Sequence, residues 1–502
     1  MNVHNHAMNM NAVIRCIMIT ALLALTAADM SAQQPPASMS LEDAIQLARR
    51  HSPAFARQVN DEGVADWNVR AAYANLLPNV SANGGLNWRA GGTRRIENID
   101  LGLRQPDQMG SSYGLGLSMS VSGATFYGMA RARAQQDATV AGVEAAAYTL
   151  EADVTRQYLE TKRMREAVAI AERDVASAEA ALELAEARIA AGAAARVDAS
   201  QAIVEMGRAE VGLLQAQANA EVAAMRLMQL IGLDFAGDVV LTSEFVVFEP
   251  GWTLAELTTL ALDNHPQLVA ARAWESAGRA SARAARMSYL PTLSMGGGWS
   301  GYTQTTLDQG FLIGQAQDQA ASSMASCQSR NDLYARLANP LPAEDCSRYV
   351  FTADDRRSIE AANSMFPFSF TKAPPSFSMS ISLPLFNGLQ REVQLQQANA
   401  AADDASQQRR ETELSLRTDL AATYLALQTA HRLVEIEARN VVAAGQQLEL
   451  QQERYRLGAG SILELTMAQA SKARADQAQL AALYSFHENM AALEAAVGRP
   501  LR

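Results

Sequence analysis

Leu41–Pro53 reads LEDAIQLARRHSP, and Leu254–Pro266 reads LAELTTLALDNHP. Both stretches begin with Leu and end with Pro, and Ala48 of the first returns as Ala261 at the same place in the second. A leucine-rich segment closed by Pro is typical of a short helix followed by the first turn of another helix. The repetition indicates that one structural unit occurs twice in the chain.

Later segments follow the same doubling. LSMSVS at Leu117–Ser122 returns as FSMSIS at Phe377–Ser382. Three further positions match in order, Gly192, Asp198 and Gly232 with Gly458, Glu464 and Gly498. We therefore expect two structural repeats, residues 33–252 and 253–502, in one continuous architecture.

Composition restricts the class of protein. Of the 502 residues, 49% are hydrophobic and only 19% are charged, and the net charge is -11. An acidic chain without a basic face is a poor partner for nucleic acid, so no nucleic-acid binding is predicted. In a pore, this charge would favour cations over anions.

Residues 1–32 are predicted to be a secretory signal peptide. An apolar run from Ile14 to Ala28 contains Arg15 and is followed by the small residues of Met30–Ala32, which is typical of a cleavage site. The alternative is a membrane anchor, but roughly 15 apolar residues fall short of the ~20 that span a bilayer.

Two cysteines, Cys327 and Cys346, remain after such a cleavage. In an exported protein, an even number of cysteines in one loop favours a disulfide. A zinc site is the alternative, and two cysteines without a neighbouring histidine do not complete one.

Four segments alternate apolar and small polar residues, which predicts short strands with one apolar face. Their expected ranges are about 78–90, 112–123, 291–301 and 376–386. Tilted membrane strands have about 9–11 residues of this kind. Half-buried strands of a soluble sheet alternate in the same way. The longer connection, residues 302–375, shows no clear periodicity and is predicted to be an extracellular loop.

Four membrane strands cannot form a closed barrel, and an open edge in lipid leaves backbone groups unpaired. We therefore expect the barrel to be shared between copies of the chain. Three copies would supply twelve strands.

Long helices follow each pair of strands. Val168, Val175, Leu182 and Ile189 recur every seven residues, with alanines between them, and the second copy has the equivalent row Val434, Val441, Leu448 and Tyr455. Helical hairpins are expected over about 128–232 and 388–498, each turning at a glycine. A helix of ~60 residues would be roughly 90 Å long, too long for a compact domain. A structural coiled coil is an alternative interpretation that accounts for the helices but for no other feature of the chain.

The chain resembles the TolC-type family of outer-membrane efflux proteins. The most specific segments are SLPLFNG at Ser382–Gly388 and RYRLGAGSILELTMAQ at Arg454–Gln469. The resemblance implies a mainly α protein with membrane β structure. It implies a homotrimer whose 12-stranded β-barrel lies in the outer membrane and continues as a 12-helix α-barrel through the periplasm. The implied partners are outer-membrane lipid, a periplasmic adaptor (membrane fusion) protein and an inner-membrane RND or ABC pump, which sets the cargo.

Site residues follow from the same resemblance. The family's adaptor-contacting turns match Ala191, Gly192, Ala193, Leu457, Gly458 and Ala459. The family's periplasmic constriction and gate match Glu464, Asp198 and Tyr455. Helix capping is an equally suitable role for the two carboxylates.

Two positions depart from the family pattern. Gly460 stands where the family has an arginine of the closed-state network, and Met467 stands where it has a second acidic ring residue. Arg196 in the first turn is a candidate for the missing charge.

No catalytic constellation or cofactor motif is present, so the chain is not predicted to be an enzyme. The histidines His51, His265, His431 and His487 do not have metal-ligand spacing. A periplasmic adaptor or a structural coiled-coil envelope protein is the alternative to an outer-membrane exit channel.

Overall fold

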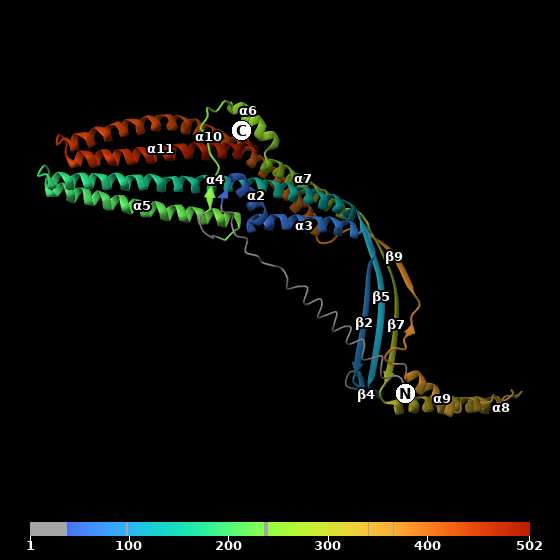
Figure 1. Cartoon of the computed structure of the whole chain (residues 1–502). Coiled ribbons are helices and arrows are strands. Elements are labelled where there is room, and N and C mark those ends of the chain that lie inside the picture. Colours follow the sequence, from blue (N-terminus) through green and yellow to red (C-terminus); the bar gives the residue numbers. More distant parts are fainter. Residues whose placement is uncertain (1–37, 97–98, 235–238, 340, 365, 502) are drawn as a thin grey trace. The chain divides into compact units, whose positions relative to one another are not determined.

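The computed structural model describes residues 38–96, 99–234, 239–339, 341–364 and 366–501 (Figure 1). The predicted signal peptide lies outside these residues. The chain forms two compact units. Of the described residues, the helical unit comprises those within Met1–Asp66, Ala134–Gly278 and Ala402–Arg502, and the strand unit comprises those within Trp67–Arg133 and Arg279–Ala401. Each unit therefore contains parts of both sequence copies.

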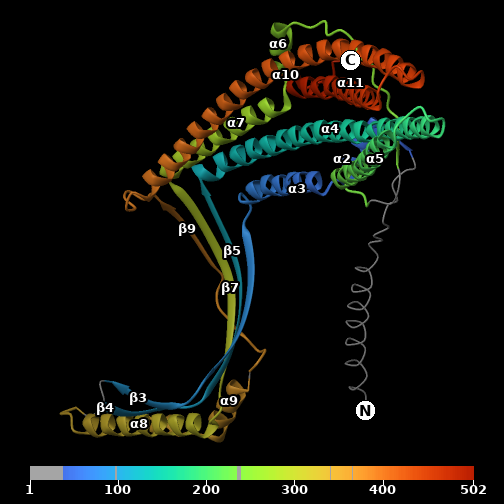
Figure 2. The same ribbon diagram turned by 90° about the vertical axis from the view of Figure 1, so that its left-hand side faces the viewer.

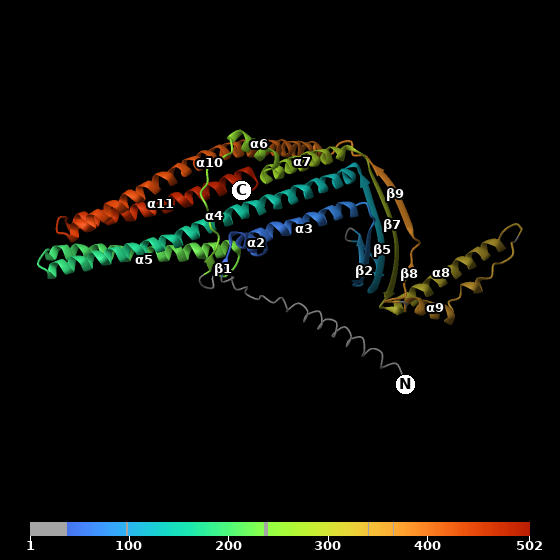
Figure 3. The same cartoon turned by 45° about the horizontal axis from the view of Figure 1, so that its top comes forward.

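The chain is mainly helical. Two long helices, α4 and α10, each turn into a shorter partner, and each pair lies side by side (Figures 1 and 3). The helices that lie wholly or partly in the helical unit are α2 (Leu41–His51), α3 (Pro53–Ala74), α4 (Gly123–Ala190), α5 (Arg196–Ile231), α6 (Leu254–Asn264), α7 (Pro266–Arg286), α10 (Gln390–Arg456) and α11 (Ile462–Val497). Among the described residues, we find no helix with the length and apolar character needed to cross a membrane.

Local sequence explains where these helices begin and end. Ser40 and Thr253 each cap a short helix through a reciprocal capping box, with Asp43 and Glu256 respectively. At the other end of each copy, α5 and α11 stop at a glycine with positive φ, 88° at Gly232 and 86° at Gly498. A side chain at Gly232 would collide with the His51 carbonyl oxygen, 2.2 Å from an ideal Cβ position.

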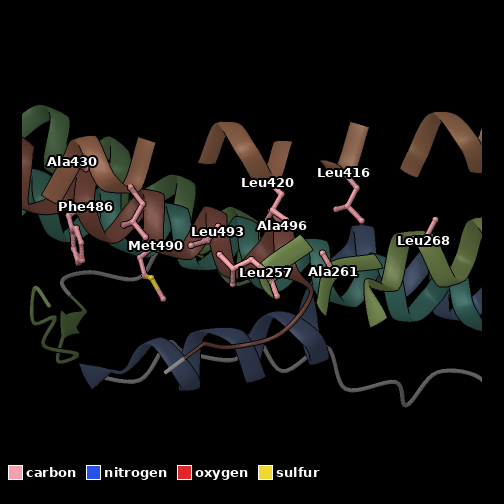
Figure 4. Packing of buried hydrophobic residues seen from close by; sticks show 12 residues of the cluster. Leu257, Ala261, Leu268, Leu416, Leu420, Ala430, Phe486, Met490, Leu493 and Ala496 are labelled. Atoms are coloured by element: carbon pink, nitrogen blue, oxygen red, sulfur yellow. The ribbon is translucent and has the colours of Figure 1, made fainter. Parts of the chain in front are cut away.

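Both copies bury equivalent residues at the base of their hairpins. In the first copy, α2, α4 and α5 pack around Leu150, Val154 and Tyr158. The second copy has a matching cluster between α6, α10 and α11, part of which is shown in Figure 4. Equivalent buried pairs include Ala44 and Leu257, Ala48 and Ala261, Leu150 and Leu416, Val154 and Leu420, Leu227 and Leu493, and Ile231 and Val497.

A hydrogen bond repeats as well. The Tyr158 hydroxyl donates to the Met39 carbonyl over 3.0 Å, and the Tyr424 hydroxyl donates to the Trp252 carbonyl over 3.1 Å. Tyrosine carries a polar hydroxyl on an apolar ring. Each ring therefore packs in the core, while its hydroxyl joins the long helix to a backbone carbonyl that is distant in sequence. The two sequence copies therefore repeat the same packing and hydrogen-bond contacts at the base of their hairpins.

The segment between the two copies runs across α4 to α6 (Figure 3). Within it, β6 (Val240–Leu241) pairs in parallel with β1 (Ser38–Met39). Lys162 donates to the Ser243 carbonyl, and the Phe245 ring lies between Tyr158 and His487. This segment therefore contacts both helical hairpins.

The strand unit contains an antiparallel sheet in the order β2 (Asn79–Arg89), β5 (Gln108–Ser122), β7 (Thr292–Thr306) and β9 (Ser376–Ser382), shown in Figure 2. The register aligns the apolar positions of all four strands. Val80, Leu117, Gly297 and Phe377 are successive cross-strand partners, and Met119, Met295 and Met379 form a second such row. Since directly paired residues share a face, the predicted apolar residues lie on one face and the serines on the other.

Three strands differ from their predicted ranges. β5 begins earlier than residue 112 and β7 continues beyond residue 301, because hydrogen bonding persists where the apolar alternation fades. β9 ends at Ser382, two residues before Pro384, a residue that has no backbone N–H to donate. A further hairpin, β3 (Gly92–Ile96) and β4 (Ile99–Gln105), was not predicted.

Residues 302–375, predicted to be an extracellular loop and lacking clear periodicity in sequence, contain regular secondary structure. The segment contains α8 (Gln309–Ala335), the 3-10 helix η2 (Cys346–Tyr349), α9 (Ala353–Asn363) and β8 (Thr371–Lys372). A disulfide joins Cys327 of α8 to Cys346 of η2. Asn363 at the end of α9 exchanges hydrogen bonds with the backbone of Thr306, which attaches the segment to β7.

Candidate functional site at the hairpin tips

Each helical hairpin turns at its tip in the same way. At the first tip, Gly192 has a φ of 71°, and at the second tip Gly458 has a φ of 80°. The N–H of Ala193 donates to the Arg188 carbonyl, and the N–H of Ala459 donates to the Arg454 carbonyl, both over 2.8 Å. These bonds, with a second N–H from each glycine, form a Schellman motif that satisfies the last carbonyls of the helix. Glycine is needed because only it adopts a positive φ at low cost.

The predicted adaptor-contacting residues form these turns. Ala191, Gly192 and Ala193 of the first tip are exposed, and so are Leu457, Gly458 and Ala459 of the second. Leu457 has 75% of its surface exposed. An apolar side chain so exposed at the end of a hairpin is available to a partner.

Glu464 takes part in a capping box at the start of α11. Its carboxylate accepts from the Ser461 N–H over 3.1 Å, and its own N–H donates to the Ser461 hydroxyl over 3.2 Å. The side chain is exposed, whereas Ile462 and Leu465 are buried. Glu464 therefore combines the capping role with a position on the outer face of its hairpin.

Asp198 has the equivalent position at the start of α5, in a different setting. The capping residue there is Ala195, which has no side-chain oxygen to accept from the helix. Asp198 instead acts on Tyr455 through its charge. Burial, and secondly the Asp198 carboxylate, raise the pKa of the Tyr455 hydroxyl, while Arg188 opposes them.

Tyr455 is buried, with 1% of its surface accessible. Its ring packs with Ala185, Ile462 and Leu465 in a cluster that joins both hairpins. The hydroxyl oxygen is buried and has no hydrogen-bond partner among the described residues. The face of the Tyr455 ring lies against Arg188, whose guanidinium carbon is 4.4 Å from the ring centroid.

Arg188 is a functional candidate that the sequence analysis missed. It donates to the Ala193 carbonyl of its own turn over 3.0 Å and to the Tyr455 carbonyl of the other hairpin over 2.5 Å. Arg196, the predicted source of a charge, is exposed. The internal repeat could have identified Arg188 as a candidate, because Arg188 and Arg454 stand at the same distance before Gly192 and Gly458.

Further from the tips, polar side chains also join the hairpins. Gln469 of α11 donates to the Ser177 carbonyl of α4 over 2.8 Å. The Tyr484 hydroxyl of α11 donates to the Glu166 carboxylate over 2.5 Å. Burial, followed by the hydrogen bond to Glu166 and its charge, raises the pKa of Tyr484.

The described histidines serve packing and backbone contacts. His265 is buried, with its Nε2 atom 3.0 Å from the Ala495 carbonyl oxygen, and burial lowers its pKa. His487 is buried against the rings of Phe245 and Phe486. Within the described ranges, no group of three or more His, Cys, Asp or Glu residues is arranged to bind a metal ion.

Comparisons with known proteins agree with this geometry. Protein CyaE of Bordetella pertussis is 24% identical over 472 residues, covering 92% of this chain and 86% of that protein. The CmeC outer membrane channel of Campylobacter jejuni has the same fold, with a TM-score of 0.68 and 14% identity over 91% of this chain and 85% of that one. The MtrE outer membrane channel of Neisseria gonorrhoeae, solved in its open state, gives a TM-score of 0.63 and 20% identity over 92% and 89% of the two chains.

The sequence profile of one family covers most of the chain. It is described as outer membrane efflux protein, and it matches residues 44–233 and 350–499. These ranges include both hairpin tips and the parts of both base clusters that α4, α5, α10 and α11 supply. The family resemblance expected from the sequence is confirmed, and the chain belongs to the outer membrane efflux protein family.

Proposed function

We propose that this protein is the outer-membrane exit channel of a tripartite efflux or type I secretion system. Three copies form a 12-stranded β-barrel in the outer membrane and a 12-helix α-barrel in the periplasm. The channel is a passive conduit without enzymatic activity or cofactor. A periplasmic adaptor opens it, and an inner-membrane RND or ABC pump drives transport through it.

The observation that carries this proposal is the two-faced sheet of the strand unit. Its apolar row includes Val80, Leu117 and Phe377, of which 70%, 45% and 73% of the surface is exposed. Within the sheet, β2 lies at one edge, and β9 with the two-residue strand β8 lies at the other. An apolar face suits lipid, and open edges are costly in lipid unless another copy pairs with them. Both needs are met when β2 of one copy pairs with β9 of the next.

The helical unit also exposes apolar surface that other copies of the chain would cover. Large apolar side chains on α5 and α10 are exposed in the single chain, among them Val204, Val211, Leu214, Leu425, Leu433 and Val442. Long helices with apolar residues on a second face are expected to pack against further helices. Neighbouring copies would cover these faces in a closed α-barrel.

The test is a pair of lysine substitutions at adjacent residues of β5. Leu117→Lys places a charge on the apolar face and should prevent outer-membrane assembly, since lysine at the midplane costs about 2–4 kcal/mol. Ser118→Lys is the matched control on the opposite face and should assemble. Membrane fractionation and a heat-sensitive trimer band on gels measure the outcome. A soluble periplasmic product from the unmodified chain would refute the channel and favour the adaptor or coiled-coil alternative.

We further propose that Glu464 and Asp198 line the periplasmic constriction and that the tip turns contact the adaptor. The Glu464 side chain is exposed and not packed within its own hairpin, which supports this proposal. In planar bilayers, Glu464→Gln should weaken cation preference and block by divalent cations. Unchanged conductance, selectivity and block would exclude Glu464 from the constriction.

A further inference from the structure

Of the polar contacts that join α4 to the second hairpin, three lie at regular intervals. They involve Glu166, Ser177 and Arg188 of α4, with separations of 177 − 166 = 11 and 188 − 177 = 11 residues. Eleven residues make about three helical turns, so all three side chains lie on one face of α4. The contact nearest the tips is that of Arg188.

The Arg188 contact differs from the other two because one side chain joins both tip turns. One terminal nitrogen of the guanidinium bonds the Ala193 carbonyl of the first turn. The other bonds the Tyr455 carbonyl, which also accepts from the Gly458 N–H in the second turn. An ideal Cβ on Gly458 would lie 3.5 Å from Arg188, which places the guanidinium directly beside that turn.

Among the residues that the structure describes, the equivalent residue of the second copy makes no such cross-link. Arg454 donates to the Ala459 carbonyl of its own turn over 3.3 Å, as Arg188 does to Ala193. Arg454 also donates to the Gln451 side chain, one turn earlier on the same helix. Arg454 thus provides a natural control for the capping part of the role of Arg188.

We propose that Arg188 is the residue that keeps the two hairpin tips of one subunit together, through the Tyr455 carbonyl and ring, and that its release accompanies opening of the channel. The inference rests on the proposed channel function. In this proposal, the ring and the backbone carbonyl of Tyr455 stabilise the closed state, and its hydroxyl does not contribute. A planar guanidinium can bond two carbonyls and stack on a ring at once, and a lysine ammonium lacks that geometry.

The experiment compares single-channel open probability of purified protein in planar bilayers. Arg188→Ala should raise it about tenfold, the usual effect of losing a charge-assisted hydrogen bond. Arg188→Lys should fall between this variant and the unmodified protein, and Arg454→Ala should change little. Tyr455→Phe should resemble the unmodified protein, whereas Tyr455→Leu should resemble Arg188→Ala.

A second measurement is independent of conduction. Ala202 is 1% exposed and lies in the same cluster as Tyr455, so a cysteine there reports separation of the hairpins. Ala202→Cys, with Cys327 and Cys346 left disulfide-bonded, should react with a thiol reagent faster when combined with Arg188→Ala than with Arg454→Ala.

Equal thiol reactivity in the two combinations would overturn the proposal, because Arg188 would then only cap its own turn. Equal effects of Tyr455→Phe and Tyr455→Leu on that reactivity would overturn the role of the ring. If the unmodified protein inserts no channels, the proposed function fails, and the thiol reactivity still decides the role of Arg188.

Discussion

The two copies in this chain make the same contacts at the base of their hairpins, whereas at the tips they share the glycine turn but differ in the contacts around it. At the base, Tyr158 and Tyr424 repeat one hydrogen bond, and Gly232 and Gly498 repeat one turn. At the tips, Ser461 completes a capping box, whereas Ala195 leaves its helix without a side-chain cap. The base is therefore a duplicated scaffold, and the tips are where the contacts of the two copies differ. Four predictions test this difference.

The largest effect is expected at the base. Gly232→Ala should destabilise the protein by about 3 kcal/mol or more, because the new Cβ meets the His51 carbonyl and φ is 88°. Gly192→Ala at the first tip has nothing within 4 Å of its Cβ. That control should cost about 1 kcal/mol for its φ alone. Thermal unfolding in detergent measures both, and equal losses would contradict the packing at Gly232.

The next effect concerns the repeated tyrosines. Tyr158→Phe should cost about 2 kcal/mol, since the buried hydroxyl bonds both the Met39 carbonyl and the Ser243 N–H. Tyr424→Phe should cost about 1 kcal/mol, because its half-buried hydroxyl bonds only the Trp252 carbonyl in the described part of the chain. Chemical unfolding of the two variants compares them. A larger loss at Tyr424 would mean that the copies are not equivalent scaffolds.

The third prediction concerns the N-cap residues of α5 and α11, which differ between the two tips. Ser461→Ala should cost about 1 kcal/mol, and Ala195→Ser should stabilise the protein by a smaller amount. Ala195 already has the extended backbone of a capping residue, with φ -89° and ψ 154°, and Asp198 stands where a capping box needs it. Amide hydrogen exchange in the first turns of α5 and α11 should slow in the serine variant and quicken in the alanine variant. Faster exchange after Ala195→Ser would show that the first tip excludes a cap.

The smallest effect depends on pH. Burial, and secondly the nearby Asp476, raise the pKa of Asp174 above its usual 3.8, while Arg173 and Lys472 oppose them. The ionised carboxylate is thus less favourable in the folded chain, and stability falls as pH rises through the raised pKa. Asp174→Asn, which copies Asn440 of the second repeat, should raise the unfolding temperature at pH 7 by about 1 °C. The gain should shrink towards pH 4, and a gain independent of pH would point to another cause.

Much of the architecture could be predicted because its signals are local. Gly192 and Gly458 mark turns by their need for positive φ, and the alternation around Leu117 marks a strand. The helix α8 was missed because its sequence has no apolar stripe, and Cys327 is its one buried residue. The β3–β4 hairpin was missed because GTRRI at Gly92–Ile96 does not alternate clearly.

The candidate site was predicted less completely. Tyr455 was expected near the closed end from family resemblance, but its partner Arg188 is 267 positions away in sequence. Arg188 and Arg454 each stand four residues before the glycine of their turn and each bond a carbonyl of that turn, so their positions do not distinguish them. The difference between them arises only where the two hairpins meet.

The amino-acid sequence alone determined the duplication, the glycine turns, the long helices and the apolar face of each strand, because periodicity and backbone preference act over a few residues. Tertiary structure decided which rows of the strands align, that Asn363 attaches α9 to β7, and that Arg188 rather than Arg196 reaches the second tip. These contacts join residues far apart in the chain, so they depend on packing that no local pattern records.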